Sequence, residues 1–219
     1  MCGMTKKLVK KRLASLLIFV VICIVIFQIN MPVLAYEVFG YKLKGTWSNK
    51  YYYVSANSVT YNGTTVNYGN IATSAVSAWN DAVDSSSGHP LDIQLSKTTN
   101  GSSAETRVVI SPLDRGATGW RGYAYYYDYN PLTGEWSPVN IGGYPNKNYQ
   151  SGSALINLYY VHSNPTWKIQ NTMMHEMGHI FGLKHSNVSG ALMVENSASY
   201  TSLKKPQSDD ISGVRSVYE

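Results

Sequence analysis

Cysteine and histidine are both scarce in this chain of 219 residues, which contains two cysteines and five histidines. The cysteines are Cys2 and Cys23, so residues 36–219 contain none and cannot form a disulfide. Charged residues make up only 14% of the sequence. Residues 36–219, which are long enough for one domain, must therefore be stabilised by a buried apolar core and by any metal that they bind.

Residues 36–219 carry no net positive charge, although the whole chain does. The sequence has 18 basic and 13 acidic residues, but five of the basic residues lie between Lys6 and Arg12, and residues 1–35 contain no acidic residue. Residues 36–219 therefore carry 13 charges of each sign. A balanced chain lacks the basic surface that nucleic acids require, so we expect no nucleic-acid partner.

The basic cluster is followed by an apolar run over residues 13–27, which is the pattern of a secretory signal peptide. Small residues at Val33 and Ala35 predict cleavage after Ala35 and a mature chain that begins at Tyr36. The alternative is an uncleaved membrane anchor, extended by residues 29–34. We expect residues 1–35 to be a signal peptide and the mature protein to be secreted and extracellular.

Three of the five histidines lie in HEMGHIFGLKH, which is residues 175–185. Residues four apart share one face of a helix, so His175 and His179 can bind one ion. Gly182 can adopt the left-handed conformation that ends a helix, and the turn would bring in His185 as a third ligand. Three protein ligands and a fourth position open to water are typical of catalytic zinc.

Glu176 follows the first of these ligands and so lies beside the metal rather than on it. From that position it can act as a general base towards a zinc-bound water and later as a proton donor. Zinc lowers the pKa of its water to about 7 and polarises the scissile carbonyl. The pattern predicts a zinc peptidase with ligands His175, His179 and His185 and Glu176 as its catalytic base.

The motif resembles that of the metzincin metallopeptidases, HExxHxxGxxH followed by a methionine turn. It is most similar to the matrixins, because Ser186 follows the third histidine, Met193 ends the segment SGALM, and the C-terminal SDDISGVRSVY resembles their last helix. The resemblance implies an α+β, zincin-like fold in which a twisted mixed sheet has a backing helix, an active-site helix and a C-terminal helix.

The same resemblance implies a single catalytic domain over residues 36–219 that cleaves protein or peptide substrates as an endopeptidase. Such substrates bind in extended form along an edge strand. Met193 would form an apolar floor beneath the three imidazoles. We expect a monomer. The resemblance further suggests that Asp209 or Asp210 binds the ammonium group of Tyr36 after cleavage, whereas their position in the first turn of a helix already explains both carboxylates.

Several family features are missing from the sequence. No cysteine is placed to hold the enzyme latent, and outside the motif only His89 and His162 remain, too few for a second, histidine-rich zinc site. Val194 and Glu195 stand where a proline and a tyrosine often follow the methionine. A tyrosine ligand two residues after Met193 is therefore excluded.

Hydrophobic periodicity predicts a helix over residues 71–83. The active-site helix should begin near Pro165 with Asn164 as its cap, and Ser208 should cap the last helix. β-branched and aromatic residues predict five strands. These are residues 51–54, 91–95, 107–110, 123–127 and 155–161.

Two further patterns leave alternatives open. Oxygen-bearing residues between Asp128 and Glu135 could bind calcium, although hairpin turn chemistry explains them equally well; they are Asp128, Asn130, Thr133, Gly134 and Glu135. The 18 tyrosines could form the working surface of a non-catalytic secreted binding module that keeps a zinc fold. The presence of Glu176 favours the enzyme, because this residue serves chemistry and not coordination.

Overall fold

The structure is a computed structural model that describes residues 36–45, 49–83, 93–195 and 203–218. The chain divides into two units, Met1–Leu34 and Ala35–Glu219, and everything below concerns the second. The predicted signal peptide and His89 lie outside the described residues, and so does much of the segment that follows Met193. Within the described part of the chain, no helix is both long and apolar enough to span a membrane.

A six-stranded sheet in the order β4-β1-β5-β10-β6-β7 forms the centre of the fold. Strands β4, β1, β5 and β10 run parallel, whereas β6 is antiparallel to both β10 and β7. The bounds are Lys50–Val54 for β1, Leu95–Lys97 for β4, Thr106–Leu113 for β5, Gly122–Asn130 for β6, Glu135–Pro138 for β7 and Ser151–Asn157 for β10.

Two hairpins accompany the sheet. Strands β2 (Ser58–Tyr61) and β3 (Thr64–Asn67) pair across a turn in which Asn62 and Gly63 both have positive φ. Strands β8 (Asn140–Ile141) and β9 (Tyr144–Pro145) pair across Gly142 and Gly143, whose φ values are 60° and 88°. Turns with two positive φ angles match the twist of a hairpin. The prediction missed both hairpins, and it also missed β7.

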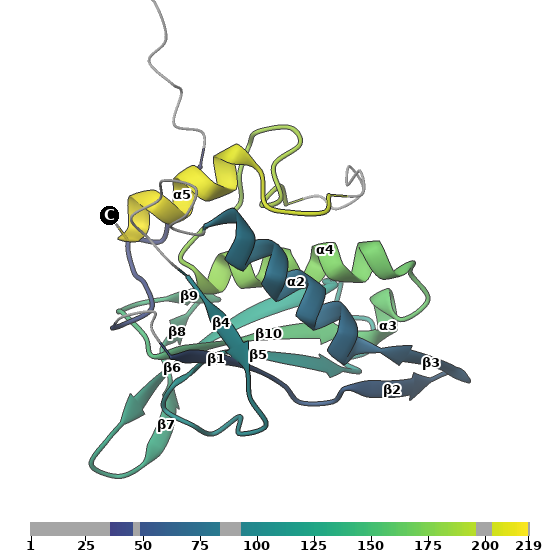
Figure 1. The fold of residues 1–219 in the computed structure, drawn as a ribbon, viewed down its shortest axis with the longest axis horizontal. Helices are drawn as coiled ribbons and strands as arrows, with labels where there is room; N and C mark the ends of the chain where they lie inside the picture. The colour runs from purple at the N-terminus through teal and green to yellow at the C-terminus, as the bar shows by residue number, and fades with distance from the viewer. Residues whose placement is uncertain (1–35, 46–48, 84–92, 196–202, 219) are drawn as a thin grey trace, which may run out of the picture. The chain divides into compact units, whose positions relative to one another are not determined.

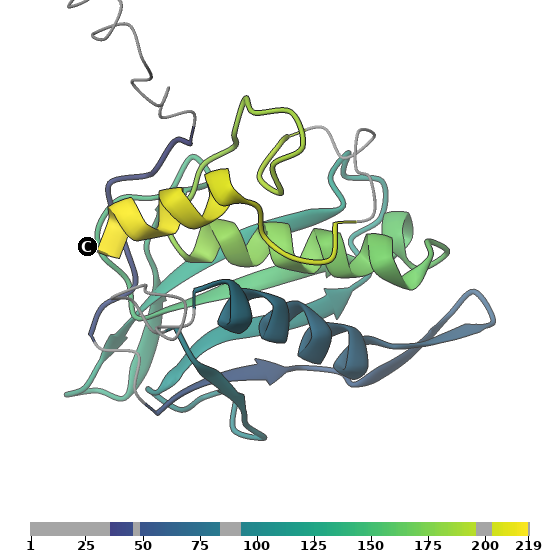
Figure 2. The ribbon, with the colours of Figure 1, turned by 45° about the horizontal axis from the view of Figure 1, so that its top comes forward.

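Helices α2 (Tyr68–Ala82) and α4 (Thr166–Ile180) lie side by side on one face of the sheet (Figures 1 and 2). The short α3 (Leu158–Val161) follows β10, and α5 (Ser208–Tyr218) lies beyond α4. The core lies between the sheet and the helices, where Trp79 of α2 packs edge-on against Phe181 at 5.1 Å between ring centroids. The α+β prediction of a mixed sheet with helices is confirmed at this level.

Several predicted elements are confirmed. The helix expected over residues 71–83 is α2, which begins earlier because the Asn67 side chain accepts a hydrogen bond from the Asn70 N–H group. Three of the predicted strands correspond to β1, β5 and β6, although the last two are longer than expected. Local periodicity was sufficient for these elements because each has one consistently buried face.

Other predicted boundaries were wrong. The strand expected over residues 155–161 ends at Asn157, whose side chain accepts from the Tyr159 N–H group and so begins α3. The strand expected over residues 91–95 contributes only Leu95 to β4. Asn164 does not cap α4; Pro165 holds the cap position, and the Asn164 side chain donates to the Tyr160 carbonyl instead. Ser208 is the first residue of α5.

Candidate active site

The three histidines of the motif come together at the C-terminal end of α4. His175 and His179 lie one turn apart on the helix, with ring centroids 4.8 Å apart. The helix ends at Ile180, and Gly182 then adopts a φ of 101°. This turn returns the chain to His185, and the three histidines offer ligand atoms that all lie within 4.8 Å of one another. The predicted grouping of His175, His179 and His185 is present.

The segment before β1 holds the loop that carries His185. The Phe39 N–H group donates to the Gly182 carbonyl at 2.9 Å, and the Lys184 N–H group donates to the Glu37 carbonyl at 2.8 Å. Val38 and Leu183 form an antiparallel bridge between these two bonds. The backbone on both sides of Leu183 is therefore fixed, which limits where His185 can lie.

Hydrogen bonds to carbonyl groups define which nitrogen each helical histidine presents. His175 Nδ1 lies 2.8 Å from the Leu192 carbonyl, and His179 Nδ1 lies 2.8 Å from the Leu183 carbonyl. A carbonyl oxygen only accepts, so Nδ1 carries the proton in both rings and Nε2 keeps its lone pair. A partner on the far nitrogen is typical of metal-binding histidines. The donor set therefore fits zinc, which prefers three or four nitrogen or sulfur ligands.

Burial also keeps these side chains in the form that binds metal. It lowers the pKa of His175 to about 4, and it lowers the pKa of His179 and His185 below the usual 6.5. Burial acts in the opposite direction on the neighbouring carboxyl group and raises the pKa of Glu176 to about 8. A bound cation would counteract this rise by favouring the charged carboxylate.

Glu176 lies against β6 at a glycine. A Cβ atom added to Gly122 would lie 2.6 Å from Glu176 Cγ and 2.7 Å from Cδ, which is closer than unbonded atoms can approach. Only a residue without a side chain fits between β6 and this carboxyl group. Gly122 was not identified from the sequence, because a glycine at the start of a strand gives no local sign that a distant carboxylate needs the space.

Met193 packs against α4 at Gly178, and its role as a floor beneath the three imidazoles stays a prediction. It is buried, and a Cβ atom added to Gly178 of α4 would overlap Met193 Sδ and lie 3.2 Å from its Cε. Gly178 is located between His175 and His179 in the sequence, so the thioether packs on the helix turn that carries both rings. Such packing would fix the geometry of the two rings, and Met193 would offer no ligand of its own.

Asp210 of α5 organises the turn that ends at Met193. Its carboxylate accepts from the N–H groups of Leu192 at 2.9 Å, Met193 at 3.0 Å and Gln207 at 2.7 Å, and the residue is 1% exposed. Burial raises the pKa of Asp210, and the three N–H donors only partly counteract this. Because the Leu192 carbonyl accepts from His175, Asp210 is linked through one residue to a predicted metal ligand.

Asp209 has a different partner. Its carboxylate accepts from the Ser186 hydroxyl at 2.7 Å, next to His185. Tyr36 lies further along α5, where a Cβ atom added to Gly213 would be 3.2 Å from Tyr36 Cβ. The contact of the Tyr36 ammonium group with an aspartate stays a prediction.

The calcium prediction is not supported. The Asp128 carboxylate binds two ammonium groups, Lys44 Nζ at 2.6 Å and Lys147 Nζ at 3.0 Å. Burial would raise the pKa of Asp128, but these lysines outweigh it and hold the pKa below its usual value. Asn130 forms turn hydrogen bonds with Leu132 and Gly134. The oxygen-rich sequence is thus explained by a hairpin, and Asp128 is already neutralised.

His162 takes no part in the cluster. Its Nε2 atom donates to the Thr64 carbonyl at 2.8 Å, so its Nδ1 atom accepts from the Tyr68 hydroxyl at 3.1 Å. It joins α3 to the β2–β3 hairpin in the core.

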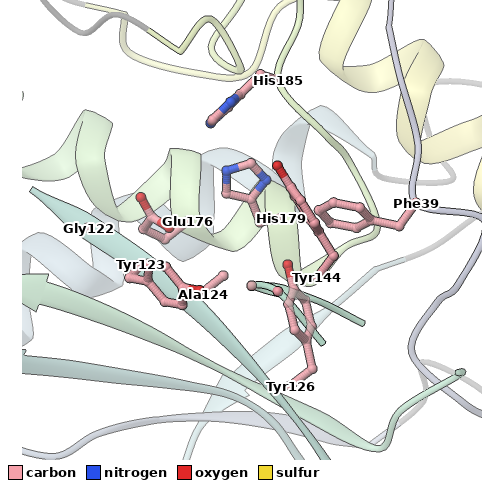
Figure 3. A pocket seen from close by; sticks show the side chains of 11 residues that line it. Phe39, Gly122, Tyr123, Ala124, Tyr126, Tyr144, Glu176, His179 and His185 are labelled. Carbon is pink, nitrogen blue, oxygen red and sulfur yellow. The ribbon is translucent and has the colours of Figure 1, made fainter. Parts of the chain in front are cut away.

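A cavity of about 190 Å³ opens beside the histidines (Figure 3). Glu176, His179 and His185 line one part of it, and residues of β6, of the β8–β9 hairpin and of the N-terminal segment line the rest. These further lining residues are Phe39, Gly122, Tyr123, Ala124, Tyr126, Gly142, Gly143 and Tyr144. The cavity exposes the candidate metal site and the carboxyl group of Glu176 to the same space.

Comparison with known proteins gives one family. The family model Peptidase M10, matrixin, matches residues 146–219, which include the three histidines, Met193 and Asp210. No curated protein matches the chain. Among solved structures, the GM1-bound form of the ECX AB5 holotoxin is 17% identical over 77% of this chain and 79% of that chain, with a TM-score of 0.44. The C-terminal third of the chain, α4 and the methionine turn included, is thus matrixin-like.

We expect the protein to bind one zinc ion, and chelation to lower its melting temperature. A ligand that binds only the native state stabilises it by RT ln(1 + [L]/Kd), which is about 4 kcal/mol at 1,000 times Kd. Metal analysis and thermal denaturation with and without a chelator measure both effects. His185→Ala should lose the zinc, whereas His162→Gln, outside the cluster, should retain it. Equal zinc content in both variants would contradict the assignment.

Proposed function

We propose that the chain is a secreted, zinc-dependent endopeptidase of the metzincin type, most similar to the matrixins. One observation carries the proposal: three histidines come together at the end of α4, and two of them, His179 and His185, line the same cavity as the carboxyl group of Glu176. A binding module would need the histidines to retain metal, but it would have no use for Glu176. His175, His179 and His185 would hold the ion, and Met193 would support them.

When bound, zinc supplies Lewis-acid chemistry, because it lowers the pKa of a water molecule and polarises a carbonyl group. Glu176 would accept the proton of the attacking water and then transfer it to the leaving amine. Its position against Gly122 keeps the carboxyl group at the cavity. The chain itself would thus contribute general acid–base catalysis, through the carboxyl group of Glu176.

The free edge of β6 offers a place for an extended peptide. Among the residues that the structure describes, β7 pairs only with Tyr127–Asn130 of β6, and β10 pairs with the other side of β6. The Tyr126 backbone faces the side of β6 away from β10, since its carbonyl accepts from the Val139 N–H group. Because strands alternate, the backbone groups of Gly122 and Ala124 face the same edge. A peptide there would add a strand beside the histidines.

The decisive experiment combines zinc stoichiometry with cleavage of a mixed peptide library, using the purified protein and its Glu176→Gln variant. We expect both to bind one zinc ion and only the unaltered protein to cleave, with activity lost to a chelator. Zinc binding without cleavage by either protein would instead favour the non-catalytic binding module. Detection of the protein in culture medium rather than in membranes tests secretion against anchoring.

A further inference from the structure

One side of the cavity is aromatic, and its rings come from three distant parts of the chain. Phe39 precedes β1, Tyr126 belongs to β6, and Tyr144 begins β9. The Phe39 ring lies 5.9 Å from Tyr126, 5.3 Å from Tyr144 and 6.0 Å from His179 between centroids. Figure 3 shows Phe39, Tyr126 and Tyr144 grouped on the side of His179 opposite Glu176. We call these three residues the aromatic pocket.

Tyr126 brings an unusual polar group to this pocket. The residue is 1% exposed, and its ring packs edge-on against Tyr149 at 4.8 Å and against Phe39. Its side chain lines the cavity, and among the residues that the structure describes its hydroxyl has no hydrogen-bond partner. The hydroxyl is not one of the fully buried atoms without a partner, so it is open to the cavity, where water or a ligand can satisfy it. A ligand that supplies the missing hydrogen bond would be favoured.

The backbone around Tyr126 ends the free edge of β6. The Tyr126 N–H group donates to Asn140 Oδ1 at 3.0 Å, and its carbonyl accepts from Val139. A peptide that pairs with Gly122 and Ala124 can therefore not continue past Tyr126. At that point its next side chain meets the aromatic pocket, immediately beside the histidines.

The β8–β9 hairpin holds Tyr144 at the mouth of the pocket. A Cβ atom added to Gly143 would lie 2.6 Å from the Tyr123 hydroxyl, so the hairpin turn packs directly on β6. Tyr144 is 55% exposed and can cover a bound side chain. The whole cavity, about 190 Å³, is smaller than the ~300–1,000 Å³ pockets of drug-sized ligands, so it suits one side chain of a peptide.

We propose, on the basis of the proposed peptidase function, that the aromatic pocket binds an aromatic side chain of the substrate next to the scissile bond, with the Tyr126 hydroxyl selecting tyrosine over phenylalanine. Phe39 and Tyr144 would contact the bound ring in offset or edge-on geometry, as aromatic rings prefer. The hydroxyl group of a substrate tyrosine would form a hydrogen bond with the Tyr126 hydroxyl. A site built to hydrogen-bond a hydroxyl group discriminates against substrates that lack one.

The test uses peptides that differ only at the residue flanking the cut, with tyrosine, phenylalanine, leucine or alanine there. We expect kcat/KM to favour tyrosine over alanine by about 10–100-fold. Tyr144→Ala should reduce this ratio by about tenfold, whereas Tyr159→Ala, which removes a ring of similar exposure (52%) outside the cavity, should not change it. Tyr126→Phe should remove the preference for tyrosine over phenylalanine, and Tyr129→Phe on the same strand, which lies outside the cavity, should keep it.

Two results would contradict the pocket and leave the peptidase proposal intact. One is equal cleavage of all four peptides. The other is an aromatic preference that survives Tyr144→Ala together with a preference for tyrosine over phenylalanine that survives Tyr126→Phe. If no peptide is cut, the proposed function fails, but the pocket is still tested by the affinity of the same peptides for the zinc-loaded Glu176→Gln protein. Tyrosine should then bind most tightly, and equal affinities would refute the pocket. Thermal denaturation confirms that each variant is folded.

Discussion

Replacing Gly122 with alanine should nearly abolish peptide cleavage while zinc stays bound. The new methyl group would lie 2.6 Å from Glu176 Cγ and 2.7 Å from Cδ, so the glutamate side chain must rotate away from β6. The three atoms nearest to this methyl group all belong to Glu176, and the carbonyl groups that hold His175 and His179 belong to Leu192 and Leu183. Because a positioned acid–base group contributes about 10²–10⁴-fold, kcat should fall by a factor in that range.

The measurement is kcat and KM on one peptide, together with zinc content and melting temperature. Gly101→Ala is the matched control, because its methyl group would overlap the Tyr53 ring, which does not line the cavity. That variant should lose stability and keep its turnover. Full activity in Gly122→Ala would show that Glu176 does not need this position, and the assignment of Glu176 as the base would then lose its structural support.

The sequence predicted those residues of the site that lie close to one another in the chain. His175 and His179 share a helix face, and Gly182 permits the turn to His185, so all three follow from eleven consecutive residues. Met193 followed from the resemblance. In contrast, Gly122 matters only because β6 passes Glu176, which is 54 positions later in the chain. No periodicity or local motif carries that information.

The unsupported calcium alternative and the wrong strand boundary have the same physical origin. A calcium loop was considered because oxygen-bearing residues cluster after Asp128, but Lys44, 84 positions earlier, neutralises this carboxylate. The strand predicted over residues 155–161 is apolar or aromatic apart from Asn157, and a buried strand and a short buried helix cannot be distinguished by period. There the side chain of Asn157 decides the outcome by capping α3.

Of all the substitutions proposed for this protein, Asp210→Ala should lower the free energy of unfolding most. Three backbone N–H groups, those of Leu192, Met193 and Gln207, would lose their acceptor in a place that is 1% exposed. Each unsatisfied buried donor costs about 1–3 kcal/mol, so we expect a loss of about 3 kcal/mol or more. For a domain of this size, that corresponds to a melting temperature lower by roughly 6–12 °C.

The same substitution should also weaken zinc binding, which separates it from a merely structural defect. Release of the Leu192 N–H group loosens the Leu192 carbonyl that holds His175 Nδ1, and loss of such a partner typically costs about 10–100-fold in metal affinity. Asp210→Asn, which keeps one acceptor oxygen, should recover part of both losses. Asp209→Ala, which loses only the Ser186 hydroxyl, should change both far less. Equal zinc affinity in all three variants would contradict a coupling between α5 and the metal site. The hydrogen bonds through Leu192 would then contribute nothing to zinc binding.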